Sequence, residues 1–349
     1  MTKEVKVGQV VIGGKAPISI QSMTNTDTRD VASTAEQIRQ LGLSGCDIVR
    51  FSVYDKDCAK AIKPLKDSTR IPLVADIHFN HELAILSIEN GIDKLRINPG
   101  NLRNEHEVKM VVDCAKAHNT PIRIGVNSGS VPKDILARDH GVTAQGLVDS
   151  AMGHVKLLEK NGFYDIVLSM KASDIRLMVD AYRLAAKTFD YPLHLGVTEA
   201  GLPGQGTIKS AIGIGALLLD GIGNTIRVSL TGDPANEPEA AISILKALGL
   251  RSGFELVSCP TCGRTEVDIE NIAKRVSEHT AHITKPIKVA IMGCVVNGPG
   301  EARGADIALC GGKSGSAIYR NGEFVLKVSG DPVPTLLKMI DEHLLDLKE

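Results

Sequence analysis

Between residues 17 and 250, short apolar runs alternate with longer segments of helical periodicity, and this alternation constrains the fold more than any other feature of the chain. Parallel strands need helical crossovers, so strand–helix repetition indicates an α/β sheet. Eight such units are the number that closes a (β/α)₈ TIM barrel, whereas a doubly wound sheet rarely has eight regular units. We therefore predict a TIM barrel, with strands at residues 17–23, 47–53, 72–79, 93–100, 121–128, 165–173, 192–201 and 225–230.

The character of the sequence changes after the helical segment 235–250, where cysteine-containing motifs replace the strand–helix repetition. A chain of 349 residues is long enough for one large domain and a smaller one. We predict a barrel domain at residues 1–252, which binds the substrate, followed by a smaller α+β domain at residues 253–349.

The charge balance excludes some classes of partner. The formal net charge is −1, which argues against binding to nucleic acid or a membrane surface through bulk electrostatics. Aromatic residues make up only 3% of the chain, so platforms for stacking bases are not expected. No apolar run reaches the roughly 18 residues of a membrane span, and the first residues do not resemble a signal peptide. We expect a cytoplasmic protein.

Four of the predicted strands carry an arginine between apolar residues, and a Ser, Asn or Gly follows each arginine two places later. Because strand side chains alternate, the arginine and the small residue share a face. In a TIM barrel, inward residues near the carboxyl ends of the strands line the pocket. Mutual repulsion makes such a group of cations costly unless an anion binds, and arginine matches phosphate geometry. The predicted cations are Arg50, Arg96, Arg123 and Arg227, with Lys171 from the sixth strand.

One acidic residue lies at the same predicted mouth. Glu199 ends the seventh strand, and a carboxylate among cations serves either proton transfer or ion pairing. Both roles remain open from the residues alone.

The cysteines indicate a metal site. Seven cysteines in a chain without an export signal favour free thiols or metal ligands over disulfides. Cys259 and Cys262 form a C-x₂-C pair, and Cys294 and Cys310 follow. Four thiolates suit structural zinc, whereas three thiolates with another ligand suit a [4Fe–4S] cluster. Spacing does not decide between these metals.

Several motifs together resemble the 4-hydroxy-3-methylbut-2-enyl diphosphate synthases, the iron–sulfur enzymes of the methylerythritol phosphate route to isoprenoids. The resemblance covers nearly the whole chain and is to the short bacterial form. The motifs are SCPTCGR, GCVVNGPGEA, KLRINPGN, RIGVNSGS, VLSMKAS, HLGVTEAG and IRVSLTGDP.

The resemblance implies roles for individual residues. It implies a [4Fe–4S] cluster in the second domain, with Cys310 as a bystander, and a diphosphate substrate in the barrel. The implied cluster ligands are Cys259, Cys262, Cys294 and Glu301. The implied diphosphate ligands are Arg50, Arg96, Arg123, Asn127, Lys171, Arg227 and Ser229. Glu199 would assist proton transfer, and Glu301 would be an exchangeable ligand, because a carboxylate binds cluster iron more weakly than a thiolate does.

The resemblance also implies a reaction and its partners. The implied reaction is the two-electron reductive ring opening and dehydration of 2-C-methyl-D-erythritol 2,4-cyclodiphosphate to (E)-4-hydroxy-3-methylbut-2-enyl diphosphate. A flavodoxin or ferredoxin would deliver the electrons, and a head-to-tail homodimer would bring one subunit's cluster to the other's barrel. Two alternatives remain: a barrel lyase or aldolase for a phosphorylated metabolite with a structural zinc domain, and a non-catalytic metal-dependent interaction module.

Overall fold

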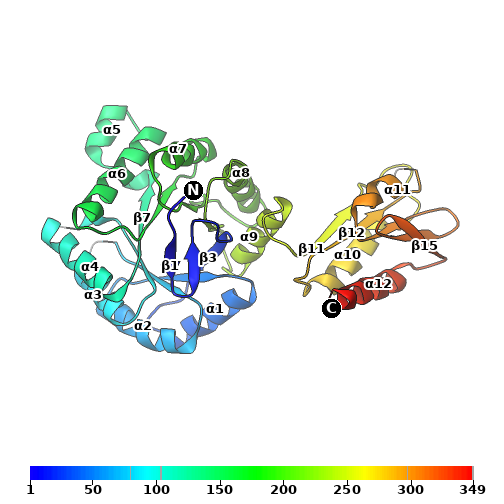
Figure 1. Ribbon diagram of the computed structural model, residues 1–349, viewed down its shortest axis with the longest axis horizontal. Helices are drawn as coiled ribbons and strands as arrows, with labels where there is room; N and C mark the ends of the chain where they lie inside the picture. The colour runs from blue at the N-terminus through cyan, green and yellow to red at the C-terminus, as the bar shows by residue number, and fades with distance from the viewer. Residues whose placement is uncertain (79, 103, 297, 348–349) are drawn as a thin grey trace. The chain divides into compact units, whose positions relative to one another are not determined.

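The computed structural model describes residues 1–78, 80–102, 104–296 and 298–347. The chain divides into two compact units, Met1–Leu250 and Arg251–Glu349 (Figure 1). No helix in the described ranges is long and apolar enough to cross a membrane.

The first unit is a TIM barrel, as predicted. Its eight parallel strands have the order β8-β7-β6-β5-β4-β3-β10-β9, and a parallel bridge between Leu168 and Leu193 joins the two ends of the sheet. The strands are β3 (Ser19–Met23), β4 (Ile48–Ser52), β5 (Leu73–Asp76), β6 (Lys94–Ile97), β7 (Ile122–Asn127), β8 (Ile166–Lys171), β9 (His194–Leu195) and β10 (Thr225–Ile226). All eight lie inside the ranges expected from the sequence, although the last two are only two residues long.

Burial explains why these segments are strands. All six positions of β8 are buried, because one face meets the barrel interior and the other meets the surrounding helices. The helices around the barrel, visible as its outer ring in Figure 1, follow the strands in turn. They are α1 (Val31–Leu43), α2 (Lys56–Ser68), α3 (His81–Glu89), α4 (Glu105–His118), α5 (Lys133–Asp139), α6 (Ala144–Lys160), α7 (Ile175–Thr188), α8 (Gln205–Leu219) and α9 (Asn236–Ala247), with short 3₁₀ turns at Pro99–Asn101 and Ser128–Ser130.

A short hairpin precedes the barrel and was not expected from the sequence. Strands β1 (Val5–Val7) and β2 (Val10–Ile12) pair antiparallel. Their buried side chains form one apolar cluster with Ile48, Val74 and Val167, which lie at the starts of β4, β5 and β8. The hairpin therefore packs against the amino-terminal end of the barrel.

The second unit is a mixed sheet with two helices on one face. The sheet has the order β11-β12-β13-β14-β15, parallel over its first three strands and antiparallel thereafter. The elements are β11 (Phe254–Ser258), α10 (Ile269–Thr280), β12 (Ile287–Met292), α11 (Gly298–Glu301), a 3₁₀ turn (Ala302–Gly304), β13 (Ile307–Cys310), β14 (Ser316–Arg320), β15 (Glu323–Val328) and α12 (Val333–Asp346).

The two faces of this sheet differ in side-chain size. Branched residues such as Val289 and Ile291 pack with α10 and α12 in the larger core. The alternate residues form a second cluster of mostly small side chains, which includes Ala290 and Cys310 and which the turn after α11 covers with Ala302. The cysteine-bearing side of the unit is therefore the side with small residues.

Candidate functional site

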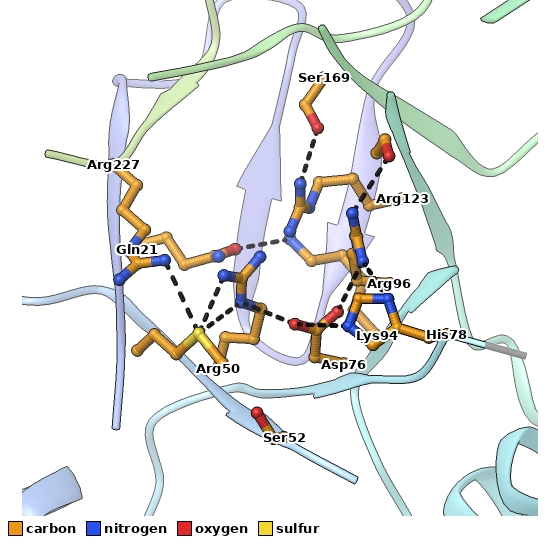
Figure 2. Close-up of polar contacts among 12 residues, drawn as sticks. Gln21, Arg50, Ser52, Asp76, His78, Lys94, Arg96, Arg123, Ser169 and Arg227 are labelled. Atoms are coloured by element: carbon orange, nitrogen blue, oxygen red, sulfur yellow. Dashed lines mark hydrogen bonds and ion pairs between the residues drawn. The ribbon is translucent and has the colours of Figure 1, made fainter. Parts of the chain in front are cut away.

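Strand register brings charged residues into one row inside the barrel. Asp76 of β5 lies opposite Arg96 of β6, and Arg96 lies opposite Arg123 of β7. Arg50 of β4 reaches the same region, as Figure 2 shows. The structure therefore brings these three arginines together inside the barrel, and their role as ligands stays a prediction.

Asp76 links two of these arginines. Its carboxylate lies 3.2 Å from Arg96 Nη1 and 3.8 Å from Arg50 Nε. Burial alone would raise the pKa of Asp76, but the positive charges of Arg50, Arg96 and Arg123 lower it to about 2. Asp76 is therefore ionised at neutral pH and fixes both guanidinium groups.

A second carboxylate holds the arginine that follows β10. Glu237 of α9 accepts hydrogen bonds from Arg227 Nε and Nη2, each at 3.0 Å, and from the hydroxyl of Ser22 at 2.7 Å. The Glu237 side chain is only 3% exposed and that of Arg227 is 15% exposed. A bidentate, nearly buried pair of this kind fixes the orientation of the guanidinium.

The deeper cations have fewer partners. Arg123 is 1% exposed and donates from Nη1 to the hydroxyl of Ser169 at 2.8 Å. Its Nε and Nη2 have no hydrogen-bond partner among the described atoms. Lys94 is completely buried, and its Nζ lies 3.4 Å from Gln21 Oε1. Burial, followed by the nearby arginine charges, lowers the pKa of Lys94 and of Arg123 well below their ordinary values.

The interior therefore carries more positive than negative charge in the part of the chain that the structure describes. Lys171, at the end of β8, is also buried, and burial followed by the charge of Arg227 lowers its pKa well below the ordinary value. Two carboxylates, Asp76 and Glu237, face six basic groups. These are Arg50, Lys94, Arg96, Arg123, Lys171 and Arg227. An excess of positive charge in a low-dielectric interior favours an anionic ligand.

The remaining predicted residues lie at the carboxyl ends of the strands. Asn127 ends β7 opposite Lys171 in register, and Ser229 follows Arg227 by two places. Both are half-buried. Glu199, beyond β9, is exposed, and its backbone φ is +54°. This value lies in the left-handed region that residues other than glycine rarely adopt. Strain of this kind is often found at functional sites.

In the second unit, three of the predicted cysteines surround one cavity. Cys259, Cys262 and Cys294 line a cavity of about 400 Å³ together with Arg264 and Met292. Cys259 Sγ accepts a hydrogen bond from the backbone of Gly293 at 3.1 Å. Hydrogen bonds from Arg264, the backbone one foremost, lower the pKa of Cys262. The lowered pKa favours the thiolate of Cys262, which is the form that binds metals.

The thiols of this cavity suit a metal group. Cys259, Cys262 and Cys294 line one shared space, and thiolates are ligands of zinc and of iron–sulfur clusters alike. No three described His, Cys, Asp or Glu side chains form a group that could hold a metal ion as they stand. The backbone of Glu301 ends α11, but its side chain lies outside what the structure describes.

Cys310 lies behind the cavity wall. It is completely buried, and burial, with the charges of Cys294 and Cys259, raises its pKa to about 11. The thiol is packed among small apolar residues, and the bystander role of Cys310 stays a prediction.

Two residues of the barrel region, Lys94 and Glu237, were not predicted from the sequence. Lys94 shares a strand face with Arg96 by its i, i+2 spacing, so the signal was available. Glu237 lies on a helix predicted from an amphipathic pattern, and no periodicity shows that this carboxylate turns inward to Arg227.

Fold and site thus define a class: a TIM-barrel protein with a cationic interior, joined to an α+β unit with three cysteines around a cavity. Two family models match the chain, the GcpE TIM-barrel domain over residues 2–242 and the GcpE protein C-terminal domain over residues 255–342. The chain belongs to the GcpE family and is an oxidoreductase of the 4-hydroxy-3-methylbut-2-en-1-yl diphosphate synthase type.

Curated relatives are similar over nearly their whole length. A protein of Caldanaerobacter subterraneus subsp. tengcongensis is 54% identical, with 100% of this chain and 96% of the relative covered. A protein of Clostridium perfringens is 56% identical, with 97% and 98% covered. Both carry the name 4-hydroxy-3-methylbut-2-en-1-yl diphosphate synthase (flavodoxin).

Two solved structures of low sequence identity share the barrel fold. Dihydropteroate synthase from Yersinia pestis has a TM-score of 0.51 at 12% identity, with 71% of this chain and 100% of that chain covered. The enzyme from Stenotrophomonas maltophilia gives the same TM-score and identity, with 71% and 97% covered.

Proposed function

We propose that this chain reduces 2-C-methyl-D-erythritol 2,4-cyclodiphosphate to (E)-4-hydroxy-3-methylbut-2-enyl diphosphate. Two electrons and two protons enter, the C–O bond to the cyclic diphosphate breaks at the tertiary carbon, and the neighbouring hydroxyl leaves as water. The observation that carries the proposal for the barrel is the excess of six basic groups over two carboxylates among the described interior residues. A diphosphate supplies the missing negative charge.

The basic residues would bind and orient the diphosphate. Glu237 holds Arg227, and Asp76 holds Arg96. Both guanidinium groups are therefore oriented before the substrate binds. Preorganised cations stabilise the negative charge that develops on the diphosphate as its C–O bond breaks. The proposed diphosphate ligands are Arg50, Arg96, Arg123, Asn127, Lys171, Arg227 and Ser229.

Glu199 would deliver the proton that turns the departing hydroxyl into water. It lies at the carboxyl end of β9, and its left-handed backbone supports a functional reason for the strained position. A Glu199→Gln variant keeps the shape but removes the proton, so kcat should fall by roughly 10²- to 10⁴-fold while substrate binding is retained.

In the second unit, Cys259, Cys262, Cys294 and Glu301 would hold a [4Fe–4S] cluster. When bound, the cluster supplies electrons one at a time and a Lewis-acidic position for the departing oxygen. Glu301 would hold that position with an oxygen ligand that substrate can replace. Glu301→Cys should retain the cluster and abolish turnover, and full turnover of this variant would rule out an exchangeable ligand.

The names of the curated relatives support a flavodoxin as electron donor. We further propose a head-to-tail homodimer in which residues 253–349 of one subunit serve residues 1–252 of the other. An apolar face on α8 supports self-association, since Ile208, Ile212 and Leu219 are each more than half exposed. Mixing an Arg227→Met protein with a Glu301→Ala protein should then restore part of the activity, whereas a site built within one subunit gives none.

The deciding experiment is metal analysis of anaerobically purified protein, followed by an assay with the cyclodiphosphate and reduced flavodoxin. The proposal predicts about four irons and four sulfides per chain and formation of the linear diphosphate. A colourless protein that binds one zinc even after reconstitution with iron and sulfide would reject the proposal and favour a lyase with a structural zinc domain.

A further inference from the structure

Three strand arginines reach a residue of the neighbouring strand that lies two places beyond their register partner. Arg50 lies opposite Val74 in register, yet its guanidinium approaches Asp76, two residues further along β5. Arg123 lies opposite Val167, yet it bonds to Ser169, two residues further along β8. Each arginine thus leans toward the carboxyl end of the next strand, as side chains in tilted barrel strands do.

Arg96 follows the same rule and meets a glycine. Its register partner is Arg123, and two residues further along β7 is Gly125. Arg96 Nη2 donates to the carbonyl of Gly125 at 3.1 Å. A Cβ atom at position 125 would lie 2.5 Å from Arg96 Nε and 2.9 Å from Nη2. The guanidinium therefore occupies the space that any other residue's side chain would need.

The backbone does not itself require glycine at this position. Gly125 lies in the interior of β7 and is absent from the residues with positive φ. Glycine in a strand interior weakens the strand and often marks a close approach by another group. Here the approaching group is the Arg96 guanidinium, whose Nη1 is fixed 3.2 Å from Asp76.

A second glycine makes room for a second cation. A Cβ atom at Gly196, just beyond β9, would lie 2.6 Å from Lys171 Nζ and 2.6 Å from the carbonyl oxygen of Arg227. Gly196 also lacks a positive φ. Because the second contact involves backbone, Gly125 gives the cleaner test.

We propose that Gly125 and Gly196 are positioning residues, which hold the Arg96 guanidinium and the Lys171 ammonium in place for an anionic ligand by leaving out a side chain. The identity of that ligand as a diphosphate rests on the proposed function. Asp76 holds Nη1 of Arg96, and the backbone carbonyl of Gly125 accepts a hydrogen bond from Nη2.

The test uses the full-length holoprotein and inorganic diphosphate as the probe. Affinity is measured by isothermal titration calorimetry for the parent protein, Gly125→Ala, Arg96→Lys and the double variant. Gly215→Ala is the matched control, since Gly215 is a buried glycine of α8 whose added Cβ meets nothing within 4 Å. Thermal unfolding midpoints are recorded for all five proteins.

Gly125→Ala should weaken diphosphate binding by roughly 10- to 100-fold, while Gly215→Ala binds as the parent does. In the Arg96→Lys background the same alanine should cause no further loss, because a lysine chain can rotate away from the new Cβ. Parent-like binding by Gly125→Ala, or an equal loss in both backgrounds, would overturn the proposal.

Two further outcomes are also decisive. If Gly125→Ala fails to fold but the double variant folds, the clash with Arg96 is supported. If neither folds, glycine serves the strand itself and the proposal is wrong. If the parent protein does not bind diphosphate, that result counts against the proposed function. The thermal unfolding midpoints then test the contact between Arg96 and position 125. Shifts of the two single variants that add up in the double variant would exclude that contact.

Discussion

Most of the charged residues of the barrel site lie on strands and are buried, whereas the cysteines of the second unit lie in loops around a cavity. Arg123 in the barrel is 1% exposed, while Cys262 in the second unit is exposed. In the barrel, Asp76 and Glu237 already hold arginines at hydrogen-bond distance. In the second unit, the cysteines share a cavity but no coordinating geometry among described residues. The barrel site is thus organised by ion pairs within the fold, whereas the cysteines lie in loops around one cavity.

The largest effect should come from removing one thiol. Cys294→Ser takes a ligand from the cavity, so we expect loss of nearly all iron and sulfide and of all measurable turnover. Diphosphate binding to the barrel should stay at the parent value. Iron and sulfide analysis with calorimetry checks both halves of this prediction. A variant that loses both properties would contradict the independence of the two sites.

Removal of a buried carboxylate tests the organisation of the barrel. Glu237→Gln leaves Arg227 without its charged partner in the interior, which should lower the free energy of unfolding by roughly 3–5 kcal/mol. Urea denaturation measures this change. Glu36→Gln is a matched control, because the pair between Glu36 and Arg39 is exposed and its loss should not be measurable. Similar effects in both variants would refute the organising role of Glu237.

A buried histidine should make the barrel sensitive to mild acid. His154 of α6 accepts a hydrogen bond from the backbone of Gly100 in the loop after β6, at 3.0 Å, and burial lowers its pKa to about 4. The unfolded chain binds a proton near pH 6.5, so this contribution to stability is complete above pH 6.5 and falls as the pH drops toward 4. We expect a loss of about 2 kcal/mol between pH 7 and pH 5.

Unfolding measured across this pH range in the parent and in His154→Gln checks the prediction. The variant should lose the part of the slope between pH 4 and pH 6.5. An unchanged slope would assign the acid sensitivity to other groups.

The smallest effect should follow from Cys310→Ala. Cys310 is buried beside the cavity, so the change removes one sulfur atom from a packed region and should cost about 1 kcal/mol of stability. Iron content should be retained. Loss of the metal would show that Cys310 is a ligand and would revive a four-cysteine site.

The same comparison explains what sequence could predict. Strand periodicity and the repeated arginine pattern placed all eight barrel strands and their inward cations other than Lys94, because backbone geometry fixes those directions. The contact between Arg227 and Glu237 could not be predicted from the sequence, because it depends on how α9 packs against the strands of the barrel. The hairpin of β1 and β2 was missed because strands of three residues carry little periodic signal. Spacing identified the cysteines, but loop geometry decides how Cys259, Cys262 and Cys294 meet.

The amino-terminal hairpin limits the routes by which substrate could enter the barrel and product could leave it. Its residues Val5, Val7 and Ile12 pack onto the starts of three barrel strands, so that end of the barrel is blocked by the chain itself. With substrate bound in the barrel as proposed, substrate and product would both pass through the opening at the carboxyl ends of the strands. A domain or subunit that covers this opening during the reaction would then have to move away once in every turnover.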